Sequence, residues 1–157
     1  MALTTAVLWF YGLMASLVLG ASVYETLVVH PAWSRKPPES LRGFSDPPVS
    51  RMNIPLFWKP VAPLYALSAL AALGTAFLAG RQGVALFVSA ACAVISVGWT
   101  LLYFRPTIER FLLSSGGDAP AERLQREVRR WIGLNWIRVA LVAVSWSGAL
   151  MTLASHG

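Results

Sequence analysis

Two charged side chains lie inside long apolar segments of this chain. Glu25 lies near the end of the first apolar segment, and Arg138 lies five residues after Gly133, near the start of the last. At about 1.5 Å of rise per helical residue, each lies roughly 6 to 8 Å inside its segment. An unpaired charge at such depth in a bilayer costs a few kcal/mol, so it indicates a functional site. The matching depths predict a Glu25–Arg138 ion pair, which would serve equally well as a structural link between the first and last helices.

Two further polar residues are expected at the same membrane level. His30 directly precedes Pro31 and has a side chain that titrates near neutral pH, so it is able to accept a proton, although many such residues are simply interfacial. Asn135 precedes Arg138 by one helical turn. Glu25 or His30 would remove a proton from an activated carbon, and Asn135 and Arg138 would stabilise the negative oxygen that forms. These four are the candidate catalytic residues.

Aromatic and polar side chains at the same membrane edge are candidate walls of a substrate pocket. The chain has seven tryptophans, and a belt of aromatic residues at the headgroup level is the ordinary explanation for several of them. The same residues are able to line an apolar pocket that takes a flat hydrophobic molecule from the bilayer. The candidate substrate-binding residues are Tyr24, Trp33, Trp58, Lys59, Glu109 and Trp136.

The sequence predicts neither a metal site nor a cofactor. Cys92 is the single cysteine, which excludes an intrachain disulfide and a thiolate cluster. His30 and His156 are expected at opposite membrane faces, which disfavours a bis-histidine haem within one chain. A carboxylate and histidine site from Glu25, His30 and Glu109 stays open, but these residues lack a recognisable ligand spacing.

Four apolar segments must position these residues. Hydrophobic residues make up 56% of the chain, charged residues only 13%, and the mean hydropathy is +0.58. One small soluble core cannot hold so many apolar side chains, so the chain is predicted to be a membrane protein. Spanning helices are expected at about 4–29, 57–79, 84–104 and 133–154. The predicted fold is an all-α integral membrane four-helix bundle, with residues 1–157 forming a single transmembrane domain.

The two long segments between spans are expected outside the hydrocarbon. Residues 30–56 contain six prolines and four basic residues, which predicts a long loop that does not sustain a helix. Residues 106–132 are amphipathic, and we expect a short helix there that lies on or just above the headgroups. A break at residues 114–117 would precede it, and Asp118 would cap it.

The basic residues predict the orientation in the membrane. All thirteen Lys and Arg residues except Arg81 and Arg138 lie in or beside the two long segments. The positive-inside rule therefore places these segments in the cytoplasm and both termini outside, in the cell membrane. The net charge of +6 fits anionic lipid headgroups as partners and does not indicate nucleic-acid binding.

Three stretches resemble the small four-span proteins of the anthrone oxygenase family, and the resemblance covers almost the whole chain. They are Tyr24-Glu25-Thr26 with Val29-His30-Pro31-Ala32-Trp33, then Phe57-Trp58-Lys59-Pro60, and then Leu134-Asn135-Trp136-Ile137-Arg138. The resemblance implies a helical membrane bundle. For characterised members it also implies the oxidation of a polyketide anthrone to an anthraquinone by molecular oxygen, without an evident metal or flavin. It carries over no catalytic residue.

Two functions of different classes fit these observations. The first is a membrane-embedded, cofactor-independent oxygenase acting on a hydrophobic phenolic or polycyclic substrate at the cytoplasmic membrane face. The second is a non-enzymatic homo-oligomer or partner subunit that binds a lipid or a quinone-like molecule. Gly12, Ser16 and Gly20 favour the second reading, because small residues at four-residue spacing allow another helix to approach closely. A transporter is third, since four spans are few for an inverted-repeat fold.

Overall fold

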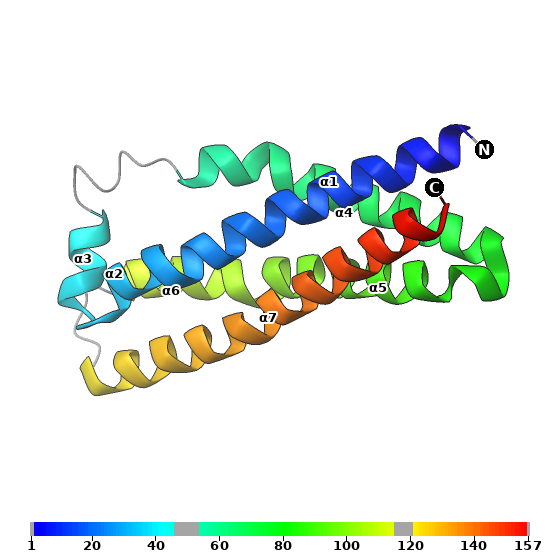
Figure 1. Ribbon diagram of the computed structural model, residues 1–157. Helices are drawn as coiled ribbons and strands as arrows, with labels where there is room; N and C mark the ends of the chain where they lie inside the picture. Colours follow the sequence, from blue (N-terminus) through cyan, green and yellow to red (C-terminus); the bar gives the residue numbers. More distant parts are fainter. Residues whose placement is uncertain (1, 46–53, 115–120, 157) are drawn as a thin grey trace.

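The computed structural model describes residues 2–45, 54–114 and 121–156, and the regular elements in these ranges are helices. Four of the resulting helical segments are long and apolar enough to cross a membrane, so the chain is an all-α membrane bundle, as predicted (Figure 1). In chain order the elements are α1 (Ala2–Tyr24), η1 (Glu25–Val29), α2 (His30–Ser34), α3 (Glu39–Ser45), α4 (Ile54–Ala79), η3 (Gly80–Gly83), α5 (Val84–Trp99), η4 (Thr100–Phe104), α6 (Arg105–Ser114) and α7 (Ala121–His156). The elements η1 and η4 are π-helical turns, and η3 is a 3₁₀ turn.

The two ends of the bundle are formed by different segments of the chain. Both chain termini and the turn η3 lie at one end, which we call the termini end, and α2, α3 and α6 lie at the other, which we call the loop end (Figure 1). Helices α1 and α5 run towards the loop end, and α4 and α7 run back. Glu25, His30 and the start of α7 therefore meet at the loop end. That the loop end faces the cytoplasm stays a prediction.

Two π turns explain why the first and third helical segments continue past the expected ends of their spans. The first helical segment runs through Pro31 to Ser34, and the third runs through Pro106 to Ser114. Proline lacks an N–H group, and its ring collides with the carbonyl group four residues earlier, which normally ends a helix. Here a widened turn, with an N–H bonded to the carbonyl five residues back, directly precedes each residue–proline pair and accommodates the ring.

The prediction of a continuous loop at residues 30–56 was therefore wrong in part. Residues 30–34 and 39–45 form helices, and α4 already begins at Ile54. Pro47, Pro48 and Arg51 lie outside the described residues. The prediction relied on the number of prolines and did not allow for a π turn that absorbs the first of them.

The amphipathic segment before the last span is the beginning of α7, which runs unbroken from Ala121 to His156. Its apolar stripe is buried within the protein, in a loop-end core formed by Trp33, Leu41, Phe104, Phe111, Leu124, Val128 and Trp131. The stripe therefore shares one core with residues of α2, α3 and α6, and the expectation of a helix separate from the last span was wrong. The position of this segment relative to the headgroups stays a prediction. Asp118 and residues 115–117 of the predicted break lie outside the described residues.

A buried hydroxyl cluster joins the four long helices nearer the termini end. The hydroxyl group of Tyr11 lies 2.9 Å from Ser89 Oγ and 2.8 Å from Ser145 Oγ. The hydroxyl group of Tyr65 lies 2.9 Å from the same Ser145 Oγ. Each of α1, α4, α5 and α7 contributes one of these side chains. Hydrogen bonds between helices hold them together in the absence of competing water, so the cluster fixes the four helices relative to one another.

The small-residue face of α1 packs inside the chain, against α7. A Cβ atom on Gly12 would lie 3.1 Å from Leu153 Cδ1. Ser16 Oγ accepts a hydrogen bond of 3.0 Å from Trp146 Nε1. Gly20 would have no atom within 4 Å of an added Cβ. Close packing along this face is thus limited to its first two members.

Replacing Gly148 by alanine is expected to lower the stability of the bundle by about 1 to 3 kcal/mol. Gly148 marks a close approach of α7 to α5, since an added Cβ would lie 2.7 Å from Ser89 Cβ and 3.2 Å from the Ala85 carbonyl oxygen. Thermal unfolding in detergent micelles measures the effect. Gly133→Ala on the same helix is the matched control, because no atom lies within 4 Å of its added Cβ. Equal stability of the two variants would contradict the prediction.

Candidate functional site

Asn135 is the centre of a buried polar network at the loop end. Its Nδ2 donates a hydrogen bond of 2.8 Å to Thr26 Oγ1 and lies 3.5 Å from His30 Nδ1. Its Oδ1 accepts a hydrogen bond of 2.9 Å from Arg138 Nε. Asn135 is completely buried, and the partners on both sides of its amide determine which atom is oxygen and which is nitrogen. We call Thr26, His30, Thr100, Asn135 and Arg138 the arginine network.

Arg138 brings a positive charge into the interior of the bundle. Its side chain is only 9% exposed. Nη1 donates a hydrogen bond of 3.2 Å to Thr100 Oγ1, and the guanidinium carbon lies 5.2 Å from the centre of the Phe104 ring. These contacts hold the guanidinium group in place, and the ring face adds a favourable cation–π interaction. Neutral groups therefore hold the cation.

The predicted ion pair between Glu25 and Arg138 is not formed. Within the described residues the ion pairs are Arg105–Glu109 and Arg123–Glu127, both exposed. Glu25 Oε1 instead accepts a hydrogen bond of 2.6 Å from Trp58 Nε1 on α4. Consecutive residues of a helix point about 100° apart, so when Thr26 faces α7, Glu25 must point elsewhere. The two charges still interact electrostatically without being in contact.

Aromatic rings enclose His30. Its ring centre lies 5.6 Å from that of Trp33 and 4.9 Å from that of Trp131, both in edge-to-face geometry. Trp131 Nε1 in turn donates to the Phe104 carbonyl oxygen at 3.2 Å, which fixes the indole ring. Because an amide NH₂ group only donates, the contact with Asn135 makes His30 Nδ1 an acceptor. This places the proton of the neutral imidazole on Nε2.

The structure brings together only part of the predicted site. His30, Asn135 and Arg138 share one network, and Glu25 lies beside it with Trp58. The other predicted substrate-binding residues lie apart. Tyr24 is 60% exposed and Trp136 is 47% exposed, while Trp33 belongs to the loop-end core. Lys59 is also exposed, and Glu109 pairs with Arg105 Nε at 3.0 Å on the surface of α6.

The three residues considered as metal ligands do not converge. The described part of the chain contains no group of three His, Cys, Asp or Glu side chains close enough to hold a metal ion. Glu25 and His30 point to different partners, and Glu109 is engaged on the surface.

Sequence reasoning missed Thr100, although a signal for it exists. The pattern Ser-Val-x-x-Thr occurs at residues 22–26 in the first span and again at 96–100 in the third. In both copies the threonine hydroxyl donates to the serine carbonyl oxygen, at 2.6 Å for Thr26 and 2.8 Å for Thr100. In both copies a π turn and a proline follow. The repeat therefore places two equivalent threonines around Asn135 and Arg138.

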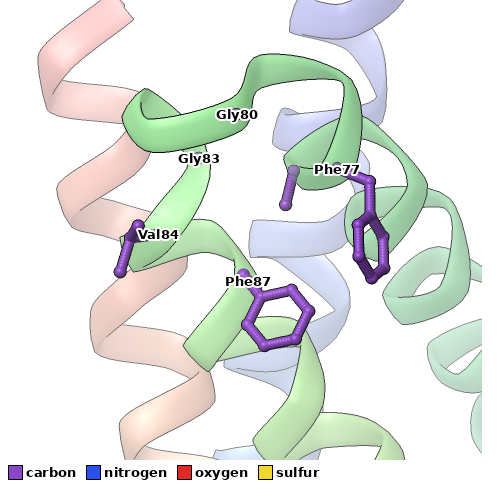
Figure 2. A pocket seen from close by; sticks show the side chains of 6 residues that line it. Phe77, Gly80, Gly83, Val84 and Phe87 are labelled. Atoms are coloured by element: carbon purple, nitrogen blue, oxygen red, sulfur yellow. The ribbon is translucent and has the colours of Figure 1, made fainter.

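A pocket of about 150 Å³ lies at the termini end, far from the arginine network (Figure 2). It opens beside η3, and the rings of Phe77 and Phe87 form one side, with their centres 5.3 Å apart. The residues that line it are Ala76, Phe77, Gly80, Gly83, Val84 and Phe87. None of these side chains is ionisable, so we assign no chemistry to this pocket.

The arginine network is suited to stabilising negative charge on oxygen. A cation held rigidly by neutral groups in an apolar interior acts strongly on charge that develops beside it, because little solvent screens it. Glu25 adds a carboxylate within electrostatic reach of that cation. The arrangement thus offers a base and a group that stabilises an oxyanion at one level of the bundle.

Comparison with known proteins identifies the family of the chain. Neither a curated protein nor a solved structure matches the chain. The sequence model of the anthrone oxygenase family matches residues 55–148. This range is more than half of the chain and includes Trp58, Thr100, Asn135 and Arg138, whereas Glu25 lies before it. The chain therefore belongs to the anthrone oxygenase family.

Proposed function

We propose that this protein is a membrane-embedded oxygenase that oxidises a hydrophobic, polycyclic phenolic substrate of the anthrone type at the arginine network. One observation carries the proposal. In a chain of this family, the buried Arg138 is held by Asn135 and Thr100 and contacts no carboxylate of the residues that the structure describes. A buried cation without a contacting counter-ion is costly, and a substrate oxygen that becomes negative would offset this cost.

The proposed reaction begins with a proton transfer. A base removes one proton from the methylene carbon of the anthrone, and the electron pair moves into the ring carbonyl group, which becomes an oxyanion next to Arg138. The anion passes one electron to O₂, and the resulting carbon radical and superoxide combine to form a C–O bond. The peroxide then takes up a proton, and loss of water leaves a second carbonyl group. One O₂ is consumed and one H₂O is released for each CH₂ group that becomes C=O.

Glu25 is the better candidate for the base. The Trp58 indole occupies Oε1, so Oε2 is left to accept a proton. His30 Nδ1 already faces the Asn135 amide, and its Nε2 carries the proton in the neutral form. We therefore assign to His30 a role in holding Asn135, and to Asn135 and Arg138 the stabilisation of the oxyanion. Lys59 is exposed and receives no role.

The proposed surroundings of the site follow from the distribution of charge. We place the loop end at the cytoplasmic face, because the exposed arginines of α7 and α6 lie there. Their positive charge is suited to anionic lipid headgroups. A hydrophobic substrate would reach the site from the bilayer.

Oxygen uptake tests the proposal directly. Purified protein in lipid nanodiscs is expected to consume O₂ in the presence of anthrone, above the rate with empty nanodiscs, and to form one anthraquinone per O₂. Glu25→Gln is expected to lower the rate about 100-fold or more, because it removes the base. The matched control is Glu109→Gln on the surface of α6, which should keep the full rate.

Two results would contradict the proposal. If the wild type takes up O₂ no faster than empty nanodiscs, the proposed oxygenase activity is contradicted. That result would favour a non-enzymatic protein that binds a lipid or quinone-like molecule. Full uptake by each of the single variants Glu25→Gln and His30→Ala would exclude both residues as the base.

A further inference from the structure

Ser22 has a buried hydroxyl group that the rest of the protein does not satisfy. The side chain is only 1% exposed, and its Oγ has no hydrogen-bond partner among the described residues. Serine and threonine in a helix commonly donate to the carbonyl group four residues earlier. Five other residues of the long helices do so, namely Ser16, Thr26, Thr75, Thr100 and Thr152. The Ser22 hydroxyl is therefore buried without the hydrogen bond that its own helix commonly supplies.

Helix register places Ser22 on α1 near the level of Arg138 on α7. Ser22, on α1, lies one turn before Thr26, which belongs to η1, and Thr26 bonds Asn135 on α7. Helices α1 and α7 pack against each other and run in opposite directions (Figure 1). The residue one turn before Thr26 therefore lies at about the same level as the residues one turn after Asn135. That turn of α7 carries Arg138.

Arg138 also has hydrogen-bond donors to spare. Its guanidinium group carries five N–H donors. The hydrogen bonds to Asn135 and Thr100 use Nε and Nη1, and Nη2 has no partner within the described residues. An unpaired hydroxyl and an unused part of a cation thus belong to neighbouring turns of two packed helices. Both groups are hydrogen-bond donors, and an oxygen atom accepts from donors of this kind.

We infer that the Ser22 hydroxyl and Arg138 Nη2 form an oxygen-binding subsite, which holds one carbonyl or phenolate oxygen of a polycyclic aromatic ligand. The inference rests on the proposed function, since it names the atoms that bind the substrate oxygen. A buried hydroxyl without a partner costs stability in the free protein, and the ligand oxygen would supply the missing partner. A subsite of this kind would discriminate strongly between ligands with and without that oxygen.

The test uses ligands that the proposed reaction does not consume. Anthraquinone carries the carbonyl oxygen, and anthracene has the same three rings without any oxygen. Binding to protein in nanodiscs is followed by quenching of tryptophan fluorescence. The wild type is expected to bind anthraquinone more tightly than anthracene. Ser22→Ala is expected to weaken the binding of anthraquinone about three- to tenfold and to leave that of anthracene unchanged.

Thermal unfolding without ligand separates binding from structure. Ser22→Ala is expected to be at least as stable as the wild type, because it removes a buried hydroxyl that has no partner. Ser68→Ala is the matched control, since Ser68 is also buried, on α4, but donates to the Tyr65 carbonyl oxygen at 2.8 Å. It is expected to lose stability and to keep the affinity for anthraquinone.

Each contrary result has a distinct meaning. If the wild type binds anthraquinone and Ser22→Ala binds it equally well, the subsite is overturned while the proposed function stands. The same holds if Ser22→Ala weakens both ligands alike, or if it destabilises the free protein as Ser68→Ala does. If the wild type binds neither ligand, the proposed function fails and the inference fails with it.

Discussion

Replacing Arg138 by methionine is expected to lower the rate of anthrone-dependent oxygen uptake by about 100- to 1000-fold, which is the effect of losing a group that stabilises an oxyanion. The bundle should remain folded, because removing a buried charge that lacks a contacting counter-ion offsets the cost of leaving Asn135 Oδ1 without its donor. Oxygen uptake and thermal unfolding, measured on the same preparation, distinguish the two effects. A loss of uptake together with unchanged stability is the expected pattern.

Two companion variants show whether position or charge matters. Arg138→Lys keeps the charge but loses the planar group that reaches Asn135 and Thr100 together, so an intermediate rate is expected. Arg126→Met removes an exposed arginine of the same helix and should leave the rate unchanged. If Arg138→Met retained full uptake, the arginine network would not be the site of oxidation.

Replacing Asn135 by aspartate is expected to separate stability from activity. The new carboxylate would stand where Oδ1 now accepts the bond from Arg138 Nε at 2.9 Å, so a buried ion pair would form. The pair would neutralise the cation before any substrate charge develops. We expect oxygen uptake to fall about 100-fold, since an oxyanion would then compete with a permanent counter-ion. Thermal unfolding should show a bundle about as stable as the wild type.

Asn135→Leu provides the contrast. It removes the acceptor of Arg138 Nε while keeping a similar branched shape, and a buried polar group left without a partner costs about 1 to 3 kcal/mol. Thr26 Oγ1 loses one donor but keeps its bond to the Ser22 carbonyl oxygen. This variant should therefore lose both stability and uptake. Full uptake by Asn135→Asp would show that the unpaired charge of Arg138 is not needed for the reaction.

Much of the fold follows from local properties of the chain. The four apolar segments predict the four long helices, because crossing a bilayer requires about 20 apolar residues in succession. The same reasoning failed at Pro31 and Pro106. Whether a proline ends a helix depends on the turn before it, and the π turns η1 and η4 are not visible in hydropathy or proline content.

The candidate site was predictable in depth but not in its contacts. Counting residues from the ends of the spans correctly brings His30, Asn135 and Arg138 to one level, because the rise per helical residue is constant. Thr100 has no charge and no ring, so only the repeated Ser-Val-x-x-Thr pattern distinguishes it from other threonines of the spans. The predicted partner of Glu25 was wrong, because the depth of a residue does not give the direction of its side chain around the helix axis.

The sequence by itself determined the membrane class, the helical architecture and the level at which each polar residue lies. These follow from hydropathy and from a fixed rise per residue, which depend only on the order of the residues. Only the tertiary structure decided which side chains meet. The side chain that each residue meets depends on the rotation of each helix, on the π turns that change this rotation, and on the packing of α7 against its neighbours. For that reason Glu25 bonds to Trp58, while Arg138 is held by Asn135 and Thr100 alone among the hydrogen-bonding side chains that the structure describes.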